Sequence, residues 1–343
     1  MVKVLHSSDL HIKEKGDERW STLETIIRKC KEENVDYLVL SGDVFHNSTV
    51  AHKNRQGLRG LFEEASFTTY IIPGNHDADC YPEDIYIGSN VHLLRKKPFT
   101  IKEEEQVRFI GLPYQDVSDE RITDILLDIE SEIDDEKTNL LLFHGDLVDV
   151  YSGADGGGEG NRTYMPMHLS YFNQSSISYV LAGHYHTDFI IRKYGAKDKN
   201  GYFVYPGSPV STTKKETDKR CVNIFEVGGD PKSVPVDTAY YKRVSLKFTG
   251  IEENPLSKIK EKIQHKPKRT QYFELNGFIS VPEKQFQKDL NTLKEEHSVE
   301  FKNRVRQLSH LTETNLYKSF MEKLEDDADV KEYFIRAALE VLE

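Results

Sequence analysis

The chain of 343 residues carries 46 Lys and Arg against 57 Asp and Glu, so its formal net charge is −11. A chain this acidic is a poor free-standing binder of polyanions, which argues against a protein that simply coats DNA. It does not exclude an enzyme that holds phosphate through metal ions, and the length predicts two domains with a sizeable core.

The cysteines indicate a reducing compartment. Cys30, Cys80 and Cys221 are odd in number and widely spaced, which is not the pattern of a disulfide framework. Residues 1–6 lead straight into a strand pattern without the apolar region of a signal peptide. Because no apolar run has the length of a membrane span, we expect a cytoplasmic protein that does not contact a membrane.

A polar pair follows the first predicted strand, residues 2–5. Asp9 and His11 are two residues apart, so on an extended backbone their side chains point to the same side. One carboxylate and one imidazole suit a divalent transition metal such as Mn²⁺, Fe²⁺ or Zn²⁺. A loop with incidental polar residues would give the same pattern.

The next polar group follows a predicted helix, residues 20–32, and a buried strand, residues 36–40. The order strand, helix, strand predicts a right-handed parallel crossover. Gly42 allows a sharp turn and places Asp43 at the carboxyl end of the strand, where open α/β sheets bind their ligands. His46 follows three residues later.

A third group, Pro-Gly-Asn-His-Asp at residues 73–77, follows a predicted strand at 68–72. Asn75 can offer its amide oxygen to a metal, His76 stands beside it, and Asp77 can orient the imidazole. Asn and Asp are also common turn residues, but Gly-Asn-His-Asp directly after a strand favours a functional site.

Two further strand ends carry histidines. The strand predicted at 139–143 ends in His144, and the strand predicted at 178–182 leads to His184 and His186. A glycine followed by two histidines that face the same way is a strong metal pattern.

The remaining elements of this half connect or extend the strands. The glycine-rich stretch 152–163 predicts a mobile loop and lacks the Gly-Lys-Ser/Thr pattern of a phosphate loop. The other expected elements are helices at 51–66 and 122–129 and strands at 91–94, 99–102, 107–112, 189–194, 201–205 and 222–227.

The strand-end residues together suffice for two metal sites that share one bridging carboxylate. Two divalent ions would bring four positive charges against two carboxylates, so the site would attract phosphate even in an acidic protein. Two ions about 3.5–4 Å apart can clamp a phosphodiester and generate a nucleophile at neutral pH. The candidate ligands are Asp9, His11, Asp43, Asn75, His144, His184 and His186.

The pattern changes at about residue 244. Strands expected at 244–248, 271–275 and 299–305 alternate with helices at 256–263 and 282–293, which predicts a small α+β domain at 244–310. Two amphipathic helices, 316–324 and 330–342, are expected in a C-terminal segment, 311–343. A basic cluster in this domain either contacts a phosphate backbone or is a solvated helix face; it comprises Lys258, Lys260, Lys262, Lys266, Lys268 and Arg269.

The ordered motifs Asp-x-His, Gly-Asp, Gly-Asn-His-Asp, His and Gly-His-x-His resemble those of the calcineurin-like metallophosphoesterases over roughly residues 1–240. The resemblance implies a four-layer α/β/β/α sandwich at 1–243. It also implies that Asp9, His11, Asp43 and His186 hold one metal, and Asp43, Asn75, His144 and His184 the other. His76, helped by Asp77, would protonate the leaving oxygen or stabilise the transition state.

Three finer motifs, Ser-Asp-Leu-His, Gly-Asp-Val-Phe-His and Tyr-Pro-Gly-Ser-Pro, resemble the SbcD-type DNA-repair nucleases. That resemblance implies two Mn²⁺ ions, a homodimer, an SbcC-type ATPase of the ABC class as partner, and a DNA-capping domain at 244–310. His46 would steer the DNA end, and the segment 311–343 is the candidate for the ATPase contact.

Two other classes of function remain open. A small-molecule or nucleotide phosphoesterase would share the fold, but His46 and the extra C-terminal domain disfavour it. A non-catalytic scaffold is disfavoured by the complete ligand set.

Overall fold

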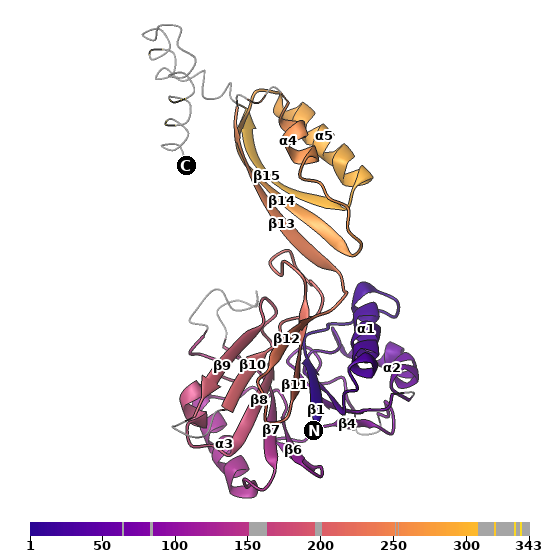
Figure 1. The fold of residues 1–343 in the computed structure, drawn as a ribbon, viewed down its shortest axis with the longest axis vertical. Coiled ribbons are helices and arrows are strands. Elements are labelled where there is room, and N and C mark those ends of the chain that lie inside the picture. Colours follow the sequence, from indigo (N-terminus) through magenta and orange to yellow (C-terminus); the bar gives the residue numbers. More distant parts are fainter. Residues whose placement is uncertain are drawn as a thin grey trace. The chain divides into compact units, whose positions relative to one another are not determined.

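The structure, a computed structural model, describes residues 1–63, 65–82, 85–150, 163–195, 201–250, 252 and 254–307, together with Ser319, Tyr333 and Ala337. It divides into two compact units, Met1–Ala239 and Tyr240–Glu343 (Figure 1). The division falls four residues before the expected boundary at 243, because the strand expected at 244 already begins at Tyr240. The glycine-rich residues 152–162 lie outside the described residues, and so do the two helices expected in 311–343 apart from Ser319, Tyr333 and Ala337.

The first sheet of the N-terminal unit has the strand order β12-β11-β1-β2-β3-β4. Strands β1 to β4 are parallel, which confirms the expected crossover, and β11 and β12 continue the sheet in antiparallel fashion. The strands are β1 (Lys3–Ser7), β2 (Tyr37–Ser41), β3 (Thr68–Ile72), β4 (Val91–Leu93), β11 (Cys221–Glu226) and β12 (Lys232–Pro235).

Two helices cover the outer face of this sheet, α1 (Glu18–Glu32) and α2 (Ser48–Glu63). Helix α1 begins where it does because the carboxylate of Asp17 accepts a hydrogen bond from the backbone N–H of Trp20 at 2.6 Å, a helix N-cap. Its buried side chains recur at helical spacing, as expected of a helix that packs one face on a sheet; they include Trp20, Leu23, Ile26, Ile27 and Cys30.

The second sheet has the strand order β5-β6-β7-β8-β10-β9, with parallel strands β6, β7, β8 and β10 between two antiparallel edge strands. Helix α3 (Asp119–Glu132), capped by Ser118, packs on its outer face. A short 3₁₀ helix, η1, spans Leu169–Phe172. The strands are β5 (Thr100–Glu103), β6 (Val107–Leu112), β7 (Thr138–His144), β8 (Ile177–Gly183), β9 (Ile190–Tyr194) and β10 (Gly201–Tyr205).

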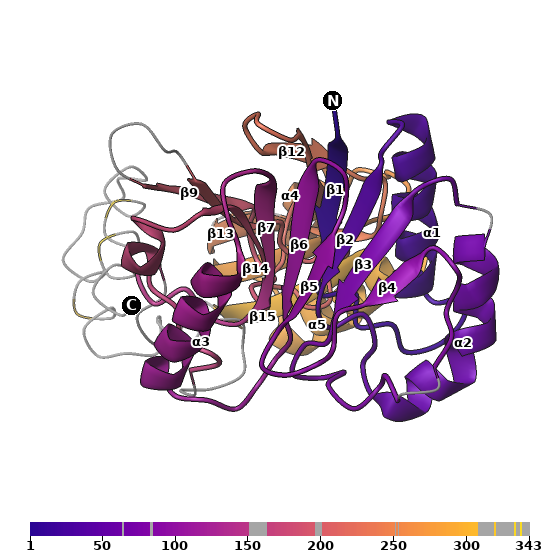
Figure 2. The ribbon, with the colours of Figure 1, turned by 90° about the horizontal axis from the view of Figure 1, so that it is seen from below.

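The two sheets pack face to face through a fully buried apolar layer, to which Val39 and Tyr70 of the first sheet and Phe109, Leu142 and Leu181 of the second contribute. With helices outside both sheets, this makes the expected four-layer α/β/β/α sandwich (Figure 2). Truncating one leucine of such a layer to alanine typically costs about 2–5 kcal/mol, so the layer holds the sheets in a fixed register.

The C-terminal unit contains a three-stranded sheet in the order β13-β14-β15. Strands and helices alternate as expected, and all three strands are parallel. Its elements are β13 (Tyr240–Thr249), α4 (Pro255–Lys260), β14 (Arg269–Ile279), α5 (Glu283–Glu296) and β15 (Val299–Gln307). None of the helices in the described ranges is long and apolar enough to cross a bilayer.

Candidate metal centre

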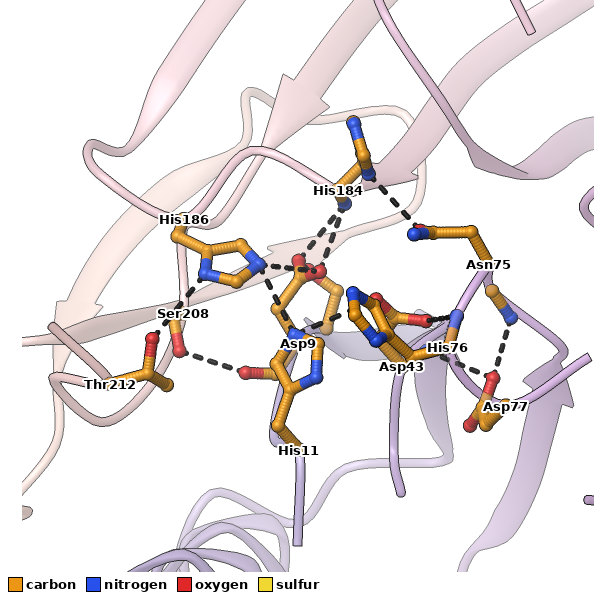
Figure 3. A network of polar contacts seen from close by, with 12 residues as sticks. Asp9, His11, Asp43, Asn75, His76, Asp77, His184, His186, Ser208 and Thr212 are labelled. Atoms are coloured by element: carbon orange, nitrogen blue, oxygen red, sulfur yellow. Dashed lines mark hydrogen bonds and ion pairs between the residues drawn. The ribbon is translucent and has the colours of Figure 1, made fainter. Parts of the chain in front are cut away.

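The carboxyl ends of the central strands of both sheets meet at one edge of the sandwich, and the predicted ligands all follow them. Asp9 and His11 follow β1, Asp43 follows β2 and Asn75 follows β3. His144 ends β7. His184 and His186 follow β8 and lie close to Asp9 and Asn75 (Figure 3). The structure therefore brings together all seven residues, from five strands of two sheets.

Four of these residues have a backbone that most side chains avoid. The φ angles are 56° at Asp9, 47° at His11, 52° at Asp43 and 98° at His184. Hydrogen bonds between the turns after β1 and β2 stabilise this left-handed backbone conformation. The N–H of Asp9 donates to the Gly42 carbonyl at 3.1 Å, and the N–H of His11 donates to the Asp43 carbonyl at 2.8 Å. Strain of this kind costs on the order of 1–3 kcal/mol per residue and is typical of functional sites.

The first ligand group consists of Asp9, His11 and His186. Nε2 of His11 lies 3.2 Å from Nε2 of His186, which in turn lies 3.4 Å from Oδ1 of Asp9. Two imidazole lone pairs face each other this closely only around a proton or a cation, so the three side chains have the donor set and the orientation of a metal site.

The second group surrounds Asn75. Its Oδ1 lies 3.0 Å from Nε2 of His144 and 3.2 Å from Nδ1 of His184. The two groups meet at Asp43, whose Oδ2 lies 3.4 Å from Nε2 of His144 and 3.5 Å from Nε2 of His11. Asp43 is therefore placed where a carboxylate shared between two metals must be.

The electrostatics of the centre favour cations. Burial alone would raise the pKa of the Asp9 and Asp43 carboxyl groups, but the neighbouring imidazoles hold both well below the usual range. Burial alone would lower the pKa of His144 and His186, yet the charges of Asp43 and Asp9 raise them to about 9 and about 10. Protons on these histidines and divalent ions are alternative counter-charges for the same carboxylates, so the residues fit a dinuclear metal site.

His76 and His46 lie beside the first group. The ring of His76 stands edge-on to that of His11 at 4.9 Å between centroids, and the ring of His46 is stacked on His76 at 6.1 Å. The backbone N–H of His76 donates to Oδ1 of Asp43 at 3.0 Å. His46 is exposed and His76 half-buried, so both can reach a substrate that lies over the ligands.

Asp77 connects two of the turns that carry the ligands. Its carboxylate is fully buried beneath the turns and accepts hydrogen bonds from the backbone N–H groups of Gly74 at 2.7 Å and Val44 at 2.8 Å, and from the Tyr81 hydroxyl at 2.8 Å. The N–H groups of Asp43 and Phe45 donate to it as well. These contacts tie the turn after β2 to the turn after β3, and the orientation of the His76 imidazole by Asp77 stays a prediction.

Sequence reasoning missed two carboxylates behind the histidines of the Gly-His-x-His motif. Oε1 of Glu216 lies 3.5 Å from Nδ1 of His186, and Oδ1 of Asp146 lies 3.5 Å from Nε2 of His184. In each case the other ring nitrogen faces the ligand group, which is the carboxylate–histidine–metal arrangement that orients ligands in metalloproteins. Asp146 could have been found two residues after His144, whereas Glu216 has no sequence motif to mark it.

The basic cluster expected in the C-terminal unit is only partly at the surface. Lys258 donates to Glu252 at 3.1 Å and lies over the ring of Phe248. Arg269 is buried and donates to the Gln264 carbonyl. The other four lysines are exposed, and their contact with a substrate stays a prediction.

The sequence matches the family model of the calcineurin-like phosphoesterases over residues 2–188. It is 24% identical over 267 residues to an uncharacterized metallophosphoesterase, YhaO, of Bacillus subtilis (strain 168); the match covers 71% of this chain and 61% of that protein. The chain thus spans less than two thirds of the length of this relative.

Solved structures resemble the fold at low identity. A dimetal phosphatase from Danio rerio is 10% identical and covers 65% of this chain and 91% of its own, with a TM-score of 0.43. The purple acid phosphatase PPD1 from yellow lupin (Lupinus luteus) seeds is 13% identical and covers 65% and 49%, with a TM-score of 0.42. The family match, which spans more than half of the sequence, shows that the chain belongs to the calcineurin-like phosphoesterase family, whose members are metal-dependent phosphoester hydrolases.

Proposed function

We propose that this chain is a two-metal nuclease that hydrolyses phosphodiesters in DNA during repair or recombination, exonucleolytically on duplex ends and endonucleolytically on single strands. One observation carries the proposal beyond a general phosphoesterase. His46 is an exposed histidine outside the two ligand groups, and it forms a third cluster with His11 and His76 in which one ligand atom of each residue lies within 4.8 Å of the others. Such a residue is placed to contact a substrate that extends past the reacting phosphate.

The two metals would have separate ligand sets joined by Asp43. Asp9, His11 and His186 would complete one site with it, and Asn75, His144 and His184 the other. When bound, divalent ions supply positive charge that attracts the phosphodiester and stabilises the charge that develops on it. We propose Mn²⁺, because carboxylate, amide and imidazole ligands together suit a metal of intermediate hardness.

The chain's own groups would then position the substrate and move a proton. His76 would donate its ring proton to the leaving oxygen, since its ring stands against His11 and its backbone is fixed on Asp43. His46 would contact the nucleotide chain next to the scissile bond and set its direction over the ligands.

The proposal includes partners that the resemblance of the motifs suggests. We propose a homodimer that works with an SbcC-type ATPase of the ABC class, which would deliver DNA ends to the nuclease. The segment 311–343 is the proposed contact, and this part of the proposal rests on sequence alone.

A cleavage assay tests the function. End-labelled duplex and single-stranded DNA are incubated with the full chain and Mn²⁺, in the presence and in the absence of a purified SbcC-type ATPase. A reaction with EDTA and a reaction with the Asp43→Asn variant are the negative controls. We expect metal-dependent products that the variant does not form. Hydrolysis of a nucleotide diester with no cleavage of either DNA, with or without the ATPase, would contradict the nuclease and support the small-molecule phosphoesterase.

A further inference from the structure

Helices α4 and α5 pack on one face of the sheet of the C-terminal unit, and no other helix within residues 240–307 that the structure describes covers the opposite face (Figure 1). Val244, Phe273 and Phe301 pair across the three strands and pack in the core with residues of α4 and α5. Because side chains alternate along a strand, the residues between them point to the opposite face. We call this opposite face the open face. It extends along the strands from the level of Arg243 on β13 to the level of Arg306 on β15, a length of about 20 Å at roughly 3.3 Å per residue.

Cations dominate this face although the whole chain is acidic. Glu274 lies 3.7 Å from Lys302, and Tyr241 donates to Glu300 at 3.5 Å, so both acids of the face have partners on it. The cations outnumber them and are all exposed; they are Arg243, Lys247, Lys302, Arg304 and Arg306. The field above the sheet is therefore positive, and it favours a polyanion.

One end of the open face combines charge with a ring. There, Asn276 pairs with Arg304, and Phe278 pairs with Arg306 on the neighbouring strand. Phe278 is half-buried, while both arginines are exposed and, among the described residues, make no ion pair. Neither pair contains an acid, so a ring, an amide and two guanidinium groups lie side by side on a flat surface.

We propose that this open sheet face of the C-terminal unit is a binding site for single-stranded DNA. Sheets that carry aromatic and cationic side chains bind unpaired bases by stacking and their phosphates by charge. A duplex keeps its bases stacked inside and would gain only the phosphate contacts. The choice of DNA rests on the proposed nuclease function, but the site itself requires neither metals nor cleavage.

Fluorescence anisotropy of a labelled oligo(dT) strand tests the site with the full chain in EDTA, where no hydrolysis occurs. Arg304→Gln/Arg306→Gln removes two cations from the open face, and Lys284→Gln/Lys288→Gln removes two exposed cations from α5 on the covered face. We expect at least a tenfold weaker Kd for the first variant and an unchanged Kd for the second. The slope of log K against log salt should fall by about 1.4, since each single-strand phosphate contact contributes roughly 0.7.

Phe278→Leu tests the stacking contact while keeping an apolar side chain. The loss of one stacked base should weaken oligo(dT) binding about fivefold or more, at unchanged salt slope and melting temperature. Equal weakening by the two double variants, or no binding by the parent chain, would overturn the proposal. Because binding is measured without metals, a chain that binds but does not cleave would refute the nuclease and leave this site standing.

Discussion

The Glu216 carboxylate lies 3.5 Å from Nδ1 of His186, on the side of the ring away from Asp9 and His11. Glu216 is itself fixed, because Thr212 donates to it through its backbone N–H at 2.6 Å and its hydroxyl at 2.7 Å. The buried carboxylate therefore sets both the rotation of the imidazole and the ring nitrogen that carries the proton, leaving Nε2 as the ligand.

Glu216→Gln should weaken the first metal site without unfolding the protein. The amide keeps the size and an acceptor oxygen, but it loses the charge that makes the imidazole a better ligand. Loss of such a contact typically lowers metal affinity on the order of 10–100-fold. Titration calorimetry with Mn²⁺ measures the effect, and Glu226→Gln, an exposed site on β11, is the control. Unchanged affinity in both variants would make Glu216 a purely structural residue of its loop.

Asp43→Asn should remove or strongly weaken both metals together, because Oδ2 of Asp43 reaches His11 and His144 alike. Asparagine tolerates the left-handed backbone at this position better than alanine does, so the fold should persist. Metal content after dialysis, measured by mass spectrometry, gives the result. Retention of one full equivalent would show that Asp43 is not the shared ligand.

His76→Ala should reduce the reaction rate and Asp77→Ala should reduce the stability, although the two residues are neighbours. His76 stands beside the ligands, so its loss should reduce the rate on the order of 10²–10⁴-fold while metal binding and stability remain. Asp77 satisfies buried backbone N–H groups, and each one left without a partner costs about 1–3 kcal/mol. Asp77→Ala should therefore lower the free energy of unfolding by about 3 kcal/mol or more. Urea unfolding of the two metal-free variants separates these roles, and equal stabilities would refute them.

The sequence predicted the sandwich and the ligand positions because both depend on local patterns. Buried strands, the glycine after β2 and the motif at 73–77 are all readable within a few residues. What it could not predict depends on tertiary contacts. Glu216 is 30 residues from the histidine it positions, and the role of Asp77 follows from the backbone of a turn that begins at Asp43. Strand β12 was missed because it is short and ends in a proline, which the edge of a sheet tolerates.

The unit after residue 239 shows a second limit of sequence patterns. Its strands and helices alternate as predicted, but the pattern alone did not reveal that all strands are parallel. Helix α4 ends at Lys260 rather than at 263, because the N–H groups of Lys262 and Ile263 donate to carbonyl groups three residues back, those of Ile259 and Lys260, instead of four residues back. The basic cluster predicted there included Arg269, which the structure buries, whereas the exposed cations of β13 and β15 alternate with core residues and so form no run in the sequence.

His46→Ser separates a DNA nuclease from a general phosphoesterase. His46 is held in place by its backbone N–H, which donates to the Ile12 carbonyl at 3.0 Å, while its exposed ring is stacked on His76. The ring lies within 4.8 Å of ligand atoms of His11 and His76 but outside the two groups that meet at Asp43, so we expect metal content and melting temperature not to change. Duplex ends must be opened and turned into the centre, and the loss of one positioning contact costs most where the geometry is tightest. We therefore expect the variant to degrade duplex ends at least tenfold more slowly than the parent chain, while cleavage of flexible single strands and of a small diester is reduced much less. Parallel rate measurements on the three substrates, at saturating Mn²⁺, decide the point. An equal loss on all three would make His46 part of the reaction itself, and no loss on any would remove the observation on which the nuclease assignment rests.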